Sequence, residues 1–172
     1  MTLPAPRWFS NLTRDGRGAF ALWAFWSVQN KGKFVYTFSR PLELVEHETS
    51  VIHADCSWFV KLLAHWTGLE NDPTFTTWGG WGNSTNIYTS PRNRVIPRWR
   101  IARGDLAVYG HNGSEHVAVI YRGGFNPLMI GDGEQGDPTL HPLSLDNRTP
   151  RYFVRIPMRT VGRPIFPPKA GR

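Results

Sequence analysis

Apolar residues recur at helical spacing twice in the first half of the chain. Asp55 is followed by four of them, Phe59, Leu62, Leu63 and Trp66, and then by Gly68. An Asp side chain accepts a backbone N–H of the first helical turn, and Gly is favoured just after the last one. The pattern therefore predicts a helix that begins after Asp55 and ends before Gly68. Residues 18–29 are apolar almost all round, which predicts a second helix buried on several sides.

The second half alternates short apolar runs with turn-forming residues. Four runs of β-formers, at residues 105–109, 116–121, 128–132 and 152–156, are each bounded by Gly, Asn or Pro. Their short connections favour an antiparallel meander. A further run at residues 34–38 predicts a short strand or extended segment. Helices followed by an antiparallel sheet predict an α+β domain.

The length of 172 residues suits one domain with a substantial core. We expect residues 1–160 to form this domain, and residues 161–172, with three prolines, to be a surface tail or the start of a linker. Residues 42–52 are acidic and should be solvated, without metal-ligand geometry. Residues 71–90 predict a long irregular loop, whose Trp78 and Trp81 either line a groove or cap the core.

The net charge of +7 and the pI near 10.1 predict an anionic partner. The basic residues are densest at residues 92–103 and from Arg151 onward, without a run of five or six, so nucleic acid and the acidic polymers of a bacterial wall both fit. The first eighteen residues lack the apolar stretch of a signal peptide, and residues 19–28 are too few to span a membrane. We therefore expect neither a signal peptide nor membrane insertion.

Cys56 is the single cysteine, which excludes an internal disulfide framework and a multi-cysteine zinc site. Its position in the first helical turn puts the sulfur at the positive end of the helix dipole, which favours the nucleophilic thiolate. The alternative is an inert, buried cysteine that packs as a small apolar side chain. No cofactor or metal is expected.

A cysteine nucleophile needs a base and a third group that orients the base. Among six histidines, only His116 stands at a strand start between a turn and an apolar run, although a structural role at a sheet edge is the alternative. Asp132 ends the following strand, and the start of one antiparallel strand lies beside the end of its neighbour. Cys56, His116 and Asp132 can therefore meet at one edge of the sheet.

Three blocks of sequence resemble a known family. Asp-Cys-Ser at 55–57, Gly-Asp-Leu-Ala-Val-Tyr-Gly at 104–110 and His-Val-Ala-Val-Ile-Tyr at 116–121 are similar to the NlpC/P60 cysteine peptidases, papain-like enzymes that cut peptidoglycan stem peptides. The similarity runs from about Tyr36 to Pro138 and is closest to the peptidase modules of phage endolysins, especially those of actinobacterial phages. The resemblance implies a papain-like NlpC/P60 fold, with the nucleophile-bearing helix packed on an antiparallel β-sheet.

The resemblance also implies roles for individual residues. Cys56 would be the nucleophile, His116 the base and Asp132 the orienting group, with Glu134 as the substitute for Asp132. The residues that would line the substrate cleft are Tyr36, Asp55, Ser57, Trp58, Trp81 and Tyr109. Two positions depart from the family: Trp58 stands where a small residue is usual, and the third catalytic position is more often His, Asn or Gln.

The function implied is cleavage of an amide bond within the stem peptide by a phage endolysin. An N-acetylmuramoyl-L-alanine amidase on the same fold is the alternative bond specificity, and a non-catalytic basic wall-binding module is the alternative class. A nucleic-acid binder lacks a recognisable reading motif. The partner expected is peptidoglycan and no nucleic acid, bound by a monomer. Without a signal peptide, we expect synthesis in the host cytoplasm and holin-dependent release, or alternatively incorporation into the virion.

Overall fold

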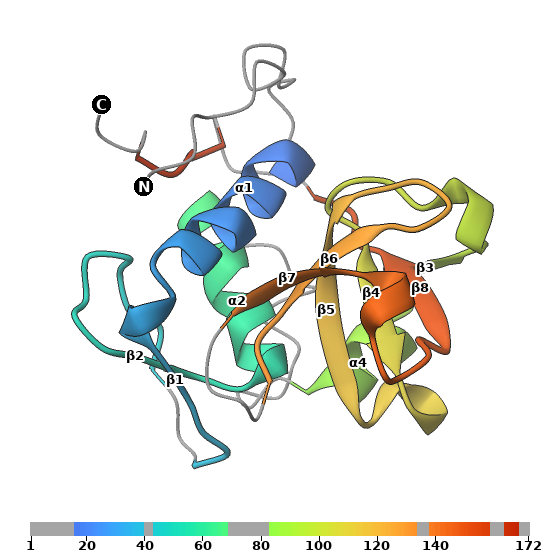
Figure 1. Cartoon of the computed structure of the whole chain (residues 1–172), viewed down its shortest axis with the longest axis horizontal. Helices are drawn as coiled ribbons and strands as arrows, with labels where there is room; N and C mark the ends of the chain where they lie inside the picture. Colours follow the sequence, from blue (N-terminus) through green and yellow to red (C-terminus); the bar gives the residue numbers. More distant parts are fainter. Residues whose placement is uncertain (1–15, 40–42, 69–82, 134–137, 159–163, 169–172) are drawn as a thin grey trace.

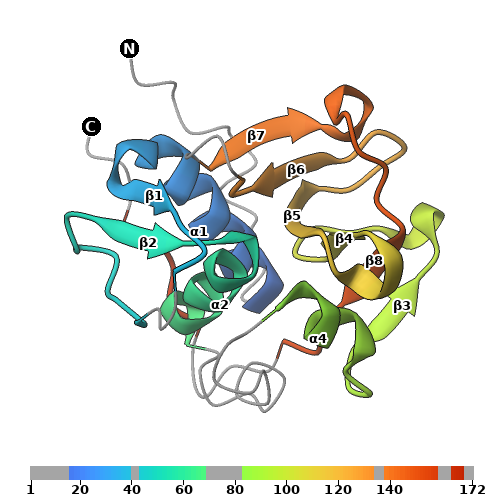
Figure 2. The same cartoon turned by 90° about the horizontal axis from the view of Figure 1, so that it is seen from below.

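The computed structural model describes residues 16–39, 43–68, 83–133, 138–158 and 164–168. It has two layers: helices α1 (Gly16–Gln29) and α2 (Cys56–Thr67) pack on one face of a six-stranded antiparallel sheet (Figure 1). The view from below in Figure 2 shows both helices on one side and the sheet on the other. The α+β prediction is confirmed.

Both predicted helices form for the reasons that the sequence indicates. The Asp55 carboxylate accepts the Trp58 backbone N–H at 2.7 Å and so caps α2. The helix ends at Gly68, whose φ of 82° is accessible to glycine at little cost. The apolar α1 begins two residues earlier than predicted and buries Trp23 completely, with its ring 5.5 Å from that of Trp66 in α2.

The sheet has the strand order β3-β8-β4-β5-β6-β7. Its strands are β3 (Arg94–Ile96), β4 (Leu106–Tyr109), β5 (His116–Arg122), β6 (Leu128–Gly131), β7 (Thr139–Pro142) and β8 (Tyr152–Arg155). The four predicted strands are all present, but β3 and β7 were missed, because each is a short outer strand with few buried residues. The meander prediction is correct only from β4 to β7, since β8 lies between β3 and β4.

Strand β5 is buried on both faces and separates two cores. Val117 and Val119 face the helices and join the main core with α1 and α2. Ala118 and Ile120 face the other way, into a smaller core closed by the short helix η5 (Leu143–Leu145). A strand buried on both sides reads as a continuous apolar run, as this one does.

Smaller elements complete the framework. Strands β1 (Phe34–Tyr36) and β2 (Ile52–Ala54) form a parallel pair beside α2, and their register sets Tyr36 opposite Ala54, two residues before the cysteine. Neither β2 nor helix α4 (Ser84–Thr89) was predicted. The remaining short helices are η2 (Lys31–Lys33), η3 (Arg98–Arg100) and η4 (His111–Gly113).

Two long-range hydrogen bonds hold part of the C-terminal segment against this framework. The Ile165 N–H donates to the Thr67 carbonyl at 3.2 Å, and the Ile165 carbonyl accepts from the Trp23 indole at 2.9 Å. This part of the C-terminal segment therefore lies on α1 and α2, while the boundary near residue 160 stays a prediction. No helix among the described residues is long and apolar enough to cross a bilayer.

A buried carboxylate ties α1 to the sheet. Asp105, just before β4, is fully buried and accepts hydrogen bonds from Arg17 at 2.7 Å and from Arg155 at 2.9 Å through each of its oxygens. The Ala102 backbone N–H donates to it as well, at 2.7 Å. Two guanidinium groups from different elements thus share one buried negative charge.

Candidate active site

Cys56 is the first residue of α2, and its side chain is 8% exposed. The backbone N–H groups of Val117 and Ser57 lie near its sulfur and lower its pKa, which favours the thiolate. Burial and the neighbouring Asp55 carboxylate act in the opposite direction and prevail, so they raise the pKa of Cys56 to about 11. The head of the helix favours the thiolate, but here desolvation and the like charge of Asp55 outweigh that effect.

His116 is the first residue of β5, as predicted, and is 5% exposed. It pairs with Tyr109 of β4, and the two ring centroids are 5.4 Å apart. Its Nε2 lies over Gly131, so close that a Cβ added to Gly131 would be 3.0 Å from it. Burial is the main cause that lowers the pKa of His116 to about 4; the Arg148 charge lowers it further and the Asp146 charge opposes.

The Cys56 sulfur lies at the start of β5, but it does not lie beside the imidazole of His116. The sulfur contacts the backbone of Val117, the residue after His116. Since side chains alternate along a strand, the imidazole lies on the Ala118 side of the sheet and the sulfur on the Val117 side. Among the described residues, no hydrogen bond joins the two side chains.

Asp132 follows β6 directly and is fully buried. Its charge acts on Cys56, where it is one of the causes of the raised pKa. Among the described contacts, neither a hydrogen bond nor an ion pair joins Asp132 to His116. At the start of β5, the Cys56 sulfur and the Asp132 carboxylate thus lie on the Val117 side of the sheet, and the His116 imidazole lies on the Ala118 side. The three catalytic roles stay predictions, and Glu134 lies outside the described residues.

A polar cluster that the sequence did not reveal lies behind His116. The Tyr109 hydroxyl donates to Asp146 at 2.5 Å, His141 lies 3.6 Å from the same carboxylate, and Arg148 stacks over the Tyr109 ring at 5.2 Å. Burial, together with Asp146, raises the pKa of Tyr109. Burial would raise the pKa of Asp146, but hydrogen bonds from Tyr109 and Arg148 lower it.

This cluster was missed because β7, which carries His141, has no apolar run. Had the strand been recognised, its pairing with β6 would have placed His141 opposite Met129, on the face that also bears His116. Gly131, which gives the imidazole its space, was visible in the sequence only as the residue before Asp132.

Of the residues predicted to contact substrate, three lie at or beside the head of α2 and one lies at the end of β1. Ser57 donates to Asp55 at 2.8 Å, and both are buried at the head of α2. Trp58 is buried and donates its indole N–H to the Glu43 carbonyl at 3.1 Å. Tyr36 is half-buried at the end of β1.

Tyr109 is 1% exposed, with its hydroxyl engaged by Asp146. Trp81 and Trp78 lie outside the described residues. As substrate contacts, Tyr36, Asp55, Ser57, Trp58, Trp81 and Tyr109 all stay predictions.

The acidic segment before β2 does hold possible metal ligands, contrary to the sequence expectation. Side-chain ligand atoms of Glu46, His47 and Glu48 lie within 4.8 Å of one another. The two glutamates are exposed, His47 pairs with Glu48 at 2.8 Å, and its ring packs 4.8 Å from that of Trp23. These contacts account for the cluster without an ion.

No protein-family model matches the sequence, and no curated protein matches it closely enough to count as a relative. Solved structures do match the fold. RipB, a peptidoglycan hydrolase from Mycobacterium tuberculosis, is 21% identical over 91% of this chain and 74% of its own, with a TM-score of 0.52. The P60 domain of an antigen from Mycobacterium avium subspecies paratuberculosis is 24% identical over 82% of this chain and 96% of its own, also at 0.52.

At such identities the likeness shows the fold. The chain has the papain-like α+β fold of NlpC/P60 domains, with the cysteine-bearing helix α2 packed against the antiparallel sheet at β5. The predicted fold class is confirmed.

Proposed function

We propose that this chain is a peptidoglycan hydrolase of the NlpC/P60 type that cleaves an amide bond of the stem peptide, with Cys56 as nucleophile and His116 as base. One observation carries the proposal: the Cys56 sulfur lies near enough to the backbone N–H of Val117 for that group to lower its pKa, and Val117 follows His116 at the start of β5. RipB, which shares the fold, is itself a peptidoglycan hydrolase.

Before substrate binds, both groups are neutral at pH 7, because the pKa of Cys56 is about 11 and that of His116 about 4. Attack on the substrate carbonyl therefore requires the thiol proton to pass to the imidazole as the S–C bond forms. The imidazolium then protonates the leaving amine as the C–N bond breaks. Water hydrolyses the resulting thioester and restores the thiol. Backbone N–H groups at the head of α2 support the oxyanion.

This scheme requires the imidazole to turn from its place over Gly131 toward the sulfur. The ring must make that movement while it is still neutral, because it takes its proton from the thiol. Asp55 and Asp132 disfavour a thiolate, but the same negative charges stabilise the imidazolium that forms beside them when the proton is transferred. In this way Asp132 takes the role of orienting group in the reacting state, although no hydrogen bond among the described contacts joins it to the ring in the resting one.

The first test replaces the nucleophile. Cys56→Ala and Cys56→Ser should abolish the release of wall fragments while the unfolding transition remains cooperative. Histidine offers a matched pair: His116→Ala should also abolish release, whereas His111→Ala, at an exposed position in η4, should not. Wild-type release rates from Cys56→Ala would overturn the proposed chemistry, and a wild-type protein that binds walls without releasing fragments would instead favour a binding module.

The bond is tested by mass spectrometry of the released fragments. Cleavage between two amino acids of the stem supports the proposed endopeptidase, and separation of the whole peptide from the sugar shows the amidase. We further propose that the chain acts as a phage endolysin, on the sequence resemblance alone. Lysis of host cells that express it only when a holin is co-expressed would support this role, and lysis without any holin would contradict it.

A further inference from the structure

A cavity of about 250 Å³ lies at the end of the molecule where α1 begins, between that helix, β3 and the segment that follows β8. It is lined by Arg17, Arg92, Arg94, Arg155, Ile156, Pro157 and Met158. None of these residues belongs to the candidate active site. Four of the seven lining residues are arginines, and the cavity is therefore a candidate binding site with its own chemistry.

Two of the arginines are held in place. Arg17 and Arg155 both bind the buried carboxylate of Asp105, Arg155 through both oxygens. Arg155 also donates to the Arg100 carbonyl at 2.9 Å. A guanidinium group that is already fixed loses little conformational entropy when it binds a ligand, so these two are preorganised.

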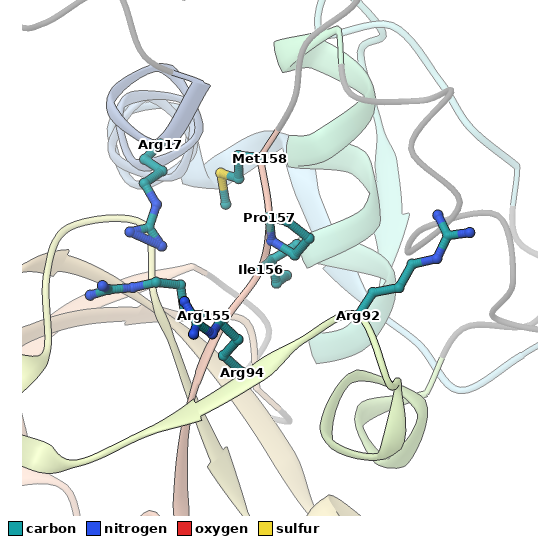
Figure 3. Close-up of a pocket in the computed structure, with 7 residues that line it drawn as sticks. All are labelled: Arg17, Arg92, Arg94, Arg155, Ile156, Pro157 and Met158. Carbon is teal, nitrogen blue, oxygen red and sulfur yellow. The ribbon is translucent and has the colours of Figure 1, made fainter.

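The other two arginines add charge that the described protein does not neutralise. Arg94 lies opposite Arg155 in the β3–β8 register, and both Arg92 and Arg94 are exposed. Neither forms an ion pair among the described residues. In Figure 3, Arg17, Arg94 and Arg155 lie together on one side of the cavity, whereas Arg92 extends away from them on the other. Guanidinium groups gathered around one cavity repel one another, and an anion bound between them would reduce that repulsion.

The remaining wall is apolar. Ile156 is 1% exposed, and Pro157 and Met158 continue the surface from it. The site thus joins several guanidinium groups to an apolar side, which suits an anionic group attached to a carbon skeleton. Guanidinium forks match the paired oxygens of phosphate, and a phosphate ester offers more acceptors to several arginines than a carboxylate does.

We propose that this cavity binds a phosphate group, carried as a phosphodiester of an anionic polymer, with Arg17, Arg94 and Arg155 on the phosphate oxygens and Met158 against the carbon chain. Binding of the phosphate stands on the cavity alone. That the polymer belongs to a bacterial wall rests on the proposed function. The site would hold the enzyme on its substrate at a distance from Cys56.

The experiment measures binding of poly(glycerol phosphate) and of inorganic phosphate to the whole protein by isothermal titration calorimetry. Arg94→Glu should weaken polymer binding about tenfold, which corresponds to about 1.4 kcal/mol. The matched control is Arg122→Glu, which makes the same charge change at the exposed end of β5 and lies outside the cavity, and it should weaken binding less than about twofold.

Equal losses in the two variants would overturn the site in favour of diffuse surface charge, as would the absence of polymer binding by the wild type. Binding of inorganic phosphate as tight as that of the polymer, per phosphate group, would overturn the polymer as the source. Arg94→Glu should leave the cleavage of a soluble stem peptide unchanged. A Cys56→Ala protein that still binds the polymer but releases no fragments separates this proposal from the catalytic one.

Discussion

Acid should destabilise this protein through His116. Its pKa lies at about 4 in the folded protein, against 6.5 for an ordinary histidine. The neutral ring is therefore the form that the fold accommodates, and its stabilising contribution is fully present above pH 6.5. As the pH falls from 6.5 to 4, His116 becomes protonated in the unfolded chain but stays largely neutral in the folded protein, so this stabilising contribution is lost. At 1.36 kcal/mol for each pH unit, the loss is about 3 kcal/mol.

The assay is the free energy of unfolding from urea titrations at pH 7, 6, 5 and 4. Carboxylates such as Asp105 also lose stabilising interactions in acid, so the comparison is made with His116→Gln, which cannot titrate. The gap between wild type and variant should shrink by about 3 kcal/mol from pH 7 to pH 4. A gap that is constant across this range would refute the buried, neutral state of His116 among Tyr109, His141, Asp146 and Arg148.

Two further predictions concern the thiol and the buried carboxylate. The pKa of Cys56, about 11 against an ordinary 9.0, predicts that between pH 9 and pH 11 stability falls by about 2 kcal/mol more in the wild type than in Cys56→Ala; parallel curves for the two proteins would contradict it. Asp105→Asn removes the negative charge that Arg17 and Arg155 share, and the free energy of unfolding in urea should fall by about 3 kcal/mol. The loss is not larger because both guanidinium groups are partly exposed and regain some water. A loss under about 1 kcal/mol would show that this ion pair contributes little.

Local features of the sequence predicted the elements that depend on neighbouring residues. Helix α2 follows from Asp55, the apolar spacing and Gly68, all within one stretch, and its bounds were correct. Strand β5 was equally clear, because burial on both faces leaves a continuous apolar run. Strands β3 and β7 were missed for the opposite reason. Their residues pair with β8 and β6 through backbone atoms, and side chains that are exposed or only partly buried leave no clear apolar pattern.

The chemical state of the site could not be predicted in the same way. The first helical turn favours a thiolate, but the pKa of Cys56 depends on how deeply the sulfur is buried and on Asp55 and Asp132. Likewise, the position of His116 at a strand start was visible in the sequence, whereas the direction of its ring depends on the space above Gly131. Both are properties of tertiary packing, which no short segment encodes.

Among the described strands, β3 and β7 form the two borders of the sheet, and a border strand has backbone groups that could recruit a strand from another molecule. The β3 border is only three residues long and bears Arg94, and the β7 border ends in Pro142, which has no N–H to offer. Short, charged or proline-bearing borders are poor templates for such pairing. Concentrated solutions of this protein therefore have little route to aggregation through strand addition, and the arginine-bearing border stays accessible to a dissolved anion.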